Sequence, residues 1–163
     1  MLSETINEAL NKQLVCEYSS FWLYLSMSAQ TRQHNLLGFA HWLELQANEE
    51  QTHGKKILEY IEDRNGKIIL GEIQKPQNEW NSMIDLFENV LTHEQMVSQK
   101  INEIYDLAHQ ENDNATAVFL QWFIMEQVEE EATSLSILER LKAINGMTGP
   151  LFYFDHELGK RKE

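Results

Sequence analysis

Residues 43–61 read LELQANEEQTHGKKILEYI, and their spacing indicates a helix with one apolar face. The positions that recur every three or four residues are Leu43, Ala47, Glu50, Gly54, Ile57 and Ile61. Glu50 therefore stands where a core residue is expected, and His53, three residues later, lies on the same face. A carboxylate and an imidazole on the inner face of one helix are the first indication of both fold and function.

The rest of the chain shows the same helical periodicity and almost no strand-like alternation. Together with the quoted stretch, the pattern predicts long helices over residues 3–32, 37–64, 80–109 and 115–145, and a short helix over 151–158. Ser3 is a good N-cap for the first of them. We expect the charged tail, residues 159–163, to fray.

Residues 67–79 differ in kind, because Gly71 and Pro76 interrupt any helical pattern and favour an extended connection, which runs from residue 65 to residue 79. About fifteen extended residues reach about 50 Å, whereas a helix of about 28 residues is about 42 Å long. The second and third helices can therefore lie parallel. The prediction is an all-α fold: a single domain over residues 1–163, built as a four-helix bundle with one long crossover between helices two and three and a short C-terminal fifth helix.

Every long helix carries a carboxylate on its apolar stripe; the stripe residues are Glu17, Glu50, Glu94, and both Glu126 and Glu130 in the fourth helix. Glu17, Glu50, Glu94 and Glu130 each lie about fourteen residues from the start of their helix, so about 20 Å along it. Midpoints coincide in a bundle whichever way its helices run. We therefore expect four carboxylates to meet in one layer of the core.

Lys and Arg are absent from these stripes near the predicted layer. Since a buried, unpaired carboxylate costs several kcal/mol, protons or two divalent cations must neutralise the four acids. The donors are oxygens and one imidazole, from His53, with no thiolate. This set favours iron or manganese over a structural zinc, although affinity alone does not exclude zinc.

Composition excludes several other classes of protein. The 13 Lys and Arg against 26 Asp and Glu leave a formal charge of −13, which argues against nucleic acid and against an anionic membrane surface as partners. A single cysteine, Cys16, cannot build a disulfide framework or a cysteine-rich metal site. Residues 1–4 lack the basic and apolar segments of a signal peptide, and no apolar run is long enough to span a bilayer, so we expect a cytoplasmic protein.

Over nearly its whole length the chain resembles the bacterial non-haem ferritins, including the crossover and the short last helix. Gln127 and Glu130 in the fourth helix also resemble that family and differ from the bacterioferritins, which have a second Glu-x-x-His there. The resemblance implies that Glu17, Glu50 and His53 hold a first iron. It implies that Glu50 bridges to a second iron held by Glu94 and Glu130, with Gln127 adjacent.

The resemblance implies further roles for side chains around this pair. Glu49, Glu126 and Glu129, together with Glu130, match a third iron site, and Tyr24 matches a tyrosine that supplies an electron near the first. The implied activity is a ferroxidase that oxidises Fe(II) with O2 and stores ferric oxyhydroxide inside a cage of twenty-four identical subunits. Trp22, Trp42, Trp80 and Trp122 lie away from the stripe centres, and their expected exposure also favours assembly.

Several related families are disfavoured by particular residues of this chain. Thr52 stands where a bacterioferritin has its haem-binding methionine, so no haem is expected, and one cysteine cannot build the second iron domain of a rubrerythrin. The small DNA-protecting ferritins place their metal ligands between subunits and often carry a basic arm, whereas this chain has a complete set of ligands within one subunit. The alternative from another class is a non-catalytic scaffold, for which Glu50→Ala stabilises the metal-free protein and leaves iron oxidation unchanged.

Overall fold

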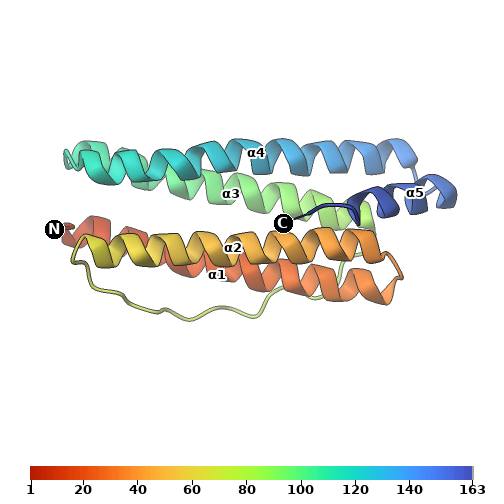
Figure 1. Ribbon diagram of the computed structural model, residues 1–163, viewed down its shortest axis with the longest axis horizontal. Helices are drawn as coiled ribbons and strands as arrows, with labels where there is room; N and C mark the ends of the chain where they lie inside the picture. Colours follow the sequence, from red (N-terminus) through yellow and green to blue (C-terminus); the bar gives the residue numbers. More distant parts are fainter. Residues whose placement is uncertain (163) are drawn as a thin grey trace.

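The computed structural model describes residues 1–162, which contain five helices and no strand. The helices are α1 (Glu4–Gln33), α2 (Leu37–Asp63), α3 (Met83–Gln110), α4 (Asn114–Ile144) and α5 (Thr148–Leu158). The four long helices form one elongated bundle, and α5 packs across one end of it (Figure 1). The predicted four-helix bundle with a short fifth helix is confirmed. No helix in residues 1–162 is both long and apolar enough to cross a membrane.

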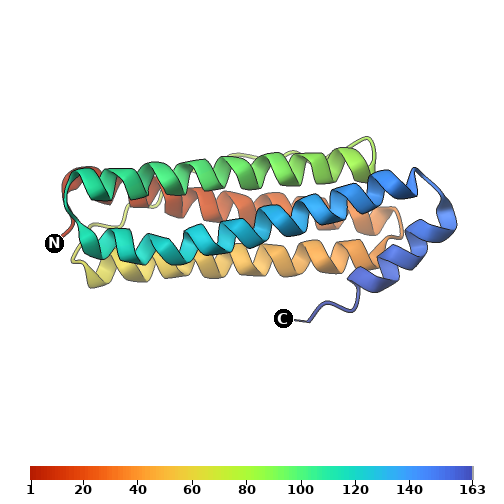
Figure 2. The same cartoon turned by 90° about the horizontal axis from the view of Figure 1, so that it is seen from above.

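The direction of each helix follows from the lengths of the connections. Short turns make α1 antiparallel to α2 and α3 antiparallel to α4, whereas the long connection returns along the outside so that α2 and α3 are parallel (Figures 1 and 2). Asn11 on α1 holds this connection: its Nδ2 donates to the Lys67 carbonyl at 2.8 Å, and its Oδ1 accepts from the Ile69 amide at 2.6 Å.

Capping side chains decide where the helices begin. The Ser3 hydroxyl accepts a hydrogen bond from the Ile6 amide, as predicted. Ser82 caps α3 in the same way, so this helix begins at Met83 rather than at residue 80. The short helix α5 begins at Thr148, three residues earlier than predicted, because Pro150 lies in its first turn, where a missing N–H is harmless.

The core consists of two apolar clusters separated along the bundle axis by a buried polar layer. One cluster includes Tyr24, Met27, Phe39, Leu43, Phe87, Val90, Ile137 and Leu141, and the other includes Ile6, Leu10, Leu14, Ile57, Ile61, Val97, Ile101 and Phe123. Glu17, Glu50, Glu94, Gln127 and Glu130 are buried between them. The polar layer lies at the midpoint of the four helices, as expected from the sequence.

The C-terminal segment is ordered against α2, which corrects the expected fraying of residues 159–162; Glu163 lies outside the described residues. Asp155 on α5 accepts hydrogen bonds from the amides of Gly38 and Phe39, each at 2.9 Å. The chain then turns back along α2, so that His41 Nε2 lies 3.0 Å from the Arg161 carbonyl oxygen. Figure 2 shows the chain end lying beside the bundle.

The expected exposure of the tryptophans is wrong for two of the four. Trp42 and Trp80 are 3% and 7% exposed, because both pack into the apolar cluster at the α5 end of the bundle. Trp22 and Trp122 remain 48% and 37% exposed. Only the latter two can therefore contribute an apolar surface to assembly.

The contact between α2 and α5 generates a stability prediction. A Cβ atom on Gly38 would lie 1.6 Å from the backbone oxygen of Asp155, so Gly38→Ala must push the two helices apart. We expect the free energy of unfolding to fall by about 1–3 kcal/mol, measured by chemical denaturation. Gly149→Ala is the matched control, because a Cβ there meets nothing within 4 Å. Equal stability of the two variants would contradict the tight helix contact.

Candidate metal centre

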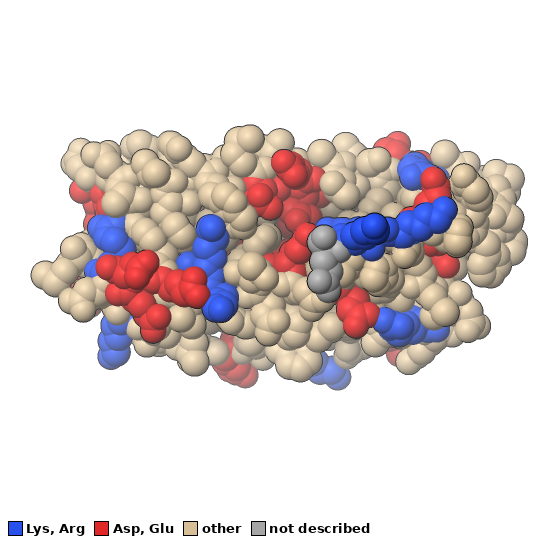
Figure 3. All heavy atoms as spheres, viewed as in Figure 1, with Lys and Arg blue, Asp and Glu red and all other residues tan. Residues whose placement is uncertain are grey.

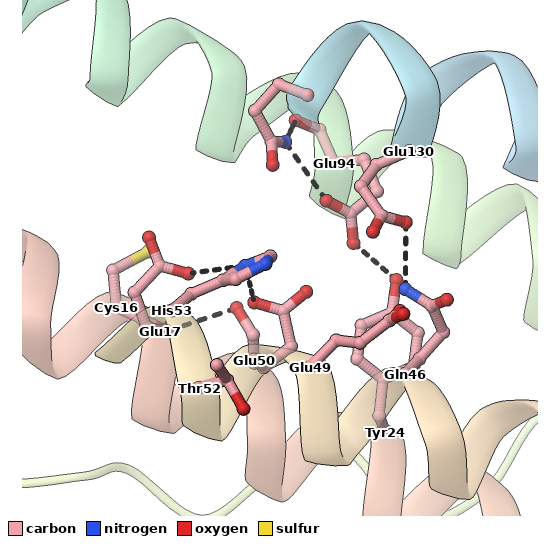
Figure 4. A network of polar contacts seen from close by, with 12 residues as sticks. Cys16, Glu17, Tyr24, Gln46, Glu49, Glu50, Thr52, His53, Glu94 and Glu130 are labelled. Atoms are coloured by element: carbon pink, nitrogen blue, oxygen red, sulfur yellow. Dashed lines mark hydrogen bonds and ion pairs between the residues drawn. The ribbon is translucent and has the colours of Figure 1, made fainter. Parts of the chain in front are cut away.

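Glu17, Glu50 and His53 form a compact, buried donor group between α1 and α2 (Figure 4). Each offers one ligand atom, and these atoms all lie within 4.8 Å of one another. His53 Nδ1 is 3.6 Å from Glu50 Oε2 and 4.0 Å from Glu17 Oε2. Glu50 and His53 share a face because they are three residues apart on one helix, and the antiparallel packing of α1 supplies Glu17. The spacing of the three donors suits a single cation.

Glu94 on α3 and Glu130 on α4 face this group from the other half of the bundle (Figure 4). Both are held by neutral donors. The Tyr24 hydroxyl donates to Glu94 Oε1, and Gln127 Nε2 donates to Glu94 Oε2 at 3.1 Å. Gln46 Nε2 donates to Glu130 Oε2 at 2.8 Å. Both carboxylate oxygens of Glu94 and one oxygen of Glu130 are therefore held by neutral partners and not by an opposite charge.

The four carboxylates share an environment that disfavours negative charge. Among residues 1–162, no Lys or Arg forms an ion pair with any of them. Burial raises the pKa of Glu17 to about 7 and that of Glu130 to about 8. Burial also raises the pKa of Glu94, and that of Glu50 well above its ordinary value, with further increases from neighbouring carboxylates. The layer therefore retains protons near neutral pH until a cation replaces them.

His53 is suited to bind a cation, because burial, and secondarily the charge of Lys56, lowers its pKa to about 4. At neutral pH the imidazole is uncharged, which is the form that ligates metals. Its ring also packs edge-on against Trp122 and Phe123, with centroids 5.4 and 6.0 Å away. These contacts keep the ring oriented toward the carboxylates.

A second group of acids lies outside the buried layer. Glu49 and Glu126 are half-buried and Glu129 is exposed. Burial raises the pKa of Glu126, and the charges of Glu129 and Glu49 raise it further, so the three carboxylates are near one another. Figure 3 shows acidic side chains gathered at the middle of this face, with basic side chains directly beside them.

The structure modifies the predicted stripe of the fourth helix. Gln127 is buried and Glu126 is only half-buried, so the inner face of α4 follows Phe123, Gln127, Glu130 and Ser134. Glu126 lies at the edge of the core, where it can face the outer acids. Glu131, the next residue after Glu130, is half-buried and accepts a hydrogen bond from Ser98.

Two glutamines that the sequence reasoning missed support the donor group. Gln13 Nε2 donates to Glu17 Oε1 at 2.7 Å, and Gln46 bonds Glu130 as described. Both are almost fully buried. The sequence does indicate their position, because Gln13 and Gln46 stand one helical turn before Glu17 and Glu50, on the same inward face.

Carboxylates and a histidine projecting into the centre of a four-helix bundle are the architecture of the dinuclear metal carboxylate proteins. Comparison with known families agrees, because the ferritin-like domain matches residues 7–144. The chain belongs to the ferritin-like family.

Individual relatives cover almost the whole chain. The bacterial non-heme ferritin of Bacteroides fragilis is 38% identical over 161 residues, which are 99% of this chain and 100% of the relative. That of Staphylococcus epidermidis is also 38% identical over 161 residues, covering 99% and 97%. Among solved structures, an open pore ferritin from Archaeoglobus fulgidus is 40% identical with a TM-score of 0.98, covering 99% and 100%.

The raised pKa of Glu130 predicts how the stability of the metal-free protein depends on pH. Between pH 4.5, the ordinary value, and about 8, the unfolded chain releases this proton while the folded chain keeps it. Stability therefore falls as pH rises, by up to about 1.4 kcal/mol per pH unit for one group. His53 acts in the opposite sense, but only between about pH 4 and 6.5. The carboxylates dominate above that window.

We expect Glu130→Gln to flatten the decline in unfolding free energy between pH 6.5 and about 8, measured by urea denaturation without metal. Glu62→Gln, an exposed position on α2, is the control and should retain the parent slope. If Glu130→Gln and the parent decline in parallel, then the Glu130 carboxylate is not protonated in the folded core.

Proposed function

We propose that this protein is a ferroxidase that oxidises Fe(II) with O2 at a dinuclear centre within each subunit and stores the ferric product. Membership of the ferritin-like family supports iron storage. The observation that carries the finer proposal is the buried group of Glu17, Glu50 and His53, whose donor atoms are within 4.8 Å of one another. Glu94 and Glu130 face it, and among the described residues no basic side chain neutralises it.

Each half of the bundle supplies one iron position. Glu17, Glu50 and His53 hold the first Fe(II), and Glu94 and Glu130 hold the second. Glu50 bridges the two, because it interacts electrostatically with Glu17 on one side and with Glu94 and Glu130 on the other. Gln127 stays a hydrogen-bond donor to Glu94 and fixes the orientation of that carboxylate. Carboxylate ligands of this kind bind Fe(II), and they also bind the harder Fe(III) ion that forms on oxidation.

The protonated carboxylates let the protein fold around an acidic core and then accept two dications. As two Fe(II) ions bind, the four carboxylates give up the protons that they hold, and four negative charges balance the two dications. Each Fe(II) ion then gives up one electron, and O2 takes both electrons together with two protons, which brings it to the oxidation level of hydrogen peroxide. The apolar clusters on either side of the layer exclude bulk water from the pair.

A third iron position is proposed at the outer acids. Glu49, Glu126 and Glu129 lie beside Glu130, which belongs to the inner layer as well. Because these acids are half-buried or exposed, an ion there is closer to solvent than the inner pair. This position can take an iron on its way to or from the oxidation centre.

The proposed assembly is a homo-oligomeric cage of twenty-four subunits in the cytoplasm, without haem. The outer face of α4 exposes several large apolar side chains: Val118, Trp122, Met125, Val128 and Leu135. A row of this kind on one helix exceeds the scattered exposure that is ordinary for a monomer. In the proposed cage, these apolar side chains contact a neighbouring subunit or line the closed interior.

The test is anaerobic Fe(II) loading of the assembled, metal-free protein followed by O2. Parent protein should bind two or three Fe(II) per subunit and show a fast optical transient, and a Glu50→Ala, His53→Ala variant should lose both. Losing two ligands of a shared pair removes the geometry that brings the ions together, so we expect the initial rate to fall by about a hundredfold or more. Glu62→Ala on the same helix is the control and should behave as the parent.

Equal, slow oxidation in parent and variant would support the scaffold alternative. In that case the interior acids serve folding, and Glu50→Ala should raise the melting temperature of the metal-free protein. If the variant binds fewer Fe(II) ions per subunit but oxidises Fe(II) as fast as the parent, then oxidation takes place at a site other than Glu50 and His53.

Tyr24 allows a narrower prediction, because its hydroxyl bonds Glu94 from within the core. If Tyr24 supplies an electron, Tyr24→Phe should leave Fe(II) binding within about twofold of the parent but abolish a transient tyrosyl radical, measured by rapid-freeze electron paramagnetic resonance. Tyr18→Phe, at a half-buried position on the same helix, is the control. A tyrosyl radical that persists in the Tyr24→Phe variant would contradict this role.

A further inference from the structure

Arg161 in the C-terminal tail reaches the acidic cluster at the middle of the bundle. Its Nη2 donates to Glu49 Oε2 at 2.7 Å, and its Nη1 donates to Gln46 Oε1. Gln46 in turn donates to Glu130 Oε2 at 2.8 Å. The guanidinium thus contacts one outer acid directly and a second acid, which belongs to the inner layer, through one amide.

Several contacts besides the ion pair with Glu49 hold Arg161 in this position. His41 Nε2 lies 3.0 Å from the Arg161 carbonyl oxygen, and the guanidinium lies 5.1 Å from the centre of the Trp42 ring. The tail leaves α5, which Asp155 ties to the start of α2. The neighbouring basic residues, Lys160 and Lys162, are both exposed.

We propose that Arg161 is a built-in counter-cation of the third iron position, which a metal ion must displace from Glu49 in order to bind there. This inference rests on the proposed function and extends it to the C-terminal tail. Glu49 Oε2 cannot accept a strong hydrogen bond from the guanidinium and coordinate a metal ion at the same time. Displacement exchanges one cation for another, so Glu49 has a positive partner both before and after the metal ion binds.

Competition of this kind makes the third position weaker than the inner pair. Among the described residues, Glu17, Glu50 and Glu94 form no ion pair with a Lys or Arg, whereas Glu49 already forms one with Arg161. The Arg161 and Glu49 side chains are 25% and 45% exposed, so solvent screens the ion pair and its contribution is modest. A weak outer position favours passage of an ion over permanent retention.

The experiment is a calorimetric titration of the assembled, metal-free protein with Zn(II), a redox-inert probe. In the parent, two equivalents per subunit bind tightly and a third binds more weakly. Arg161→Gln should lower the Kd of the third equivalent by about three- to tenfold and leave the first two unchanged. Lys162→Gln removes the same charge from the same tail without the contact, and it should match the parent.

Hydrogen exchange supplies a readout that is independent of affinity. In the parent, backbone amides of residues 159–162 should exchange faster once the third equivalent is bound, because the guanidinium has left Glu49. The same amides should not respond to the first two equivalents.

Three results would overturn the inference. One is an equal third Kd in the parent and Arg161→Gln, and another is an equal decrease in Arg161→Gln and Lys162→Gln, which would indicate long-range charge alone. A weaker third site in Arg161→Gln would show that Arg161 supports Glu49 as a ligand and does not compete. The absence of the first two tight equivalents is distinguishable from these results, and it would overturn the proposed function and the inference together.

Discussion

The central constraint on this molecule is a layer of four buried carboxylates, none of which forms an ion pair with a Lys or Arg within residues 1–162. Each acid interrupts an apolar stripe, and burial raises its pKa until the layer keeps protons near neutral pH. Such a layer is costly to fold around. It is tolerated because a long apolar cluster packs on either side of it and because neutral donors, Tyr24, Gln46 and Gln127, satisfy individual oxygens.

The topology of the bundle brings these four carboxylates together. The turn between α1 and α2 brings Glu17 beside Glu50 and His53, and the turn between α3 and α4 pairs Glu94 with Glu130. The long crossover then lets the two hairpins face one another with their midpoints aligned (Figure 1). The proposed dinuclear centre lies on rigid helices, so helix packing and not loop structure spaces the side chains proposed as its ligands.

The outer acids and the tail have a different character, because they are partly exposed and paired with a cation. Arg161 and Glu49 form an ion pair at the edge of the same layer, and Gln46 links Arg161 to Glu130. The buried centre and the outer group are thus joined by one amide. In the proposed function an ion is oxidised and then passed on, and a tight inner position beside a weaker outer one suits both steps.

The helices and the depth of the acids follow from the amino-acid sequence, because helical periodicity and distance along a helix are local properties. The sequence predicted Ser3 as a cap and Glu17, Glu50, Glu94 and Glu130 at the midpoints of their helices. Which of Glu126 and Gln127 faces inward depends on tertiary packing, because adjacent positions differ by about 100° around a helix and packing sets the rotation of the helix. The burial of Trp42 and the placement of Arg161 also required it, since both depend on α5 folding back onto α2, a contact between residues that are distant in the chain.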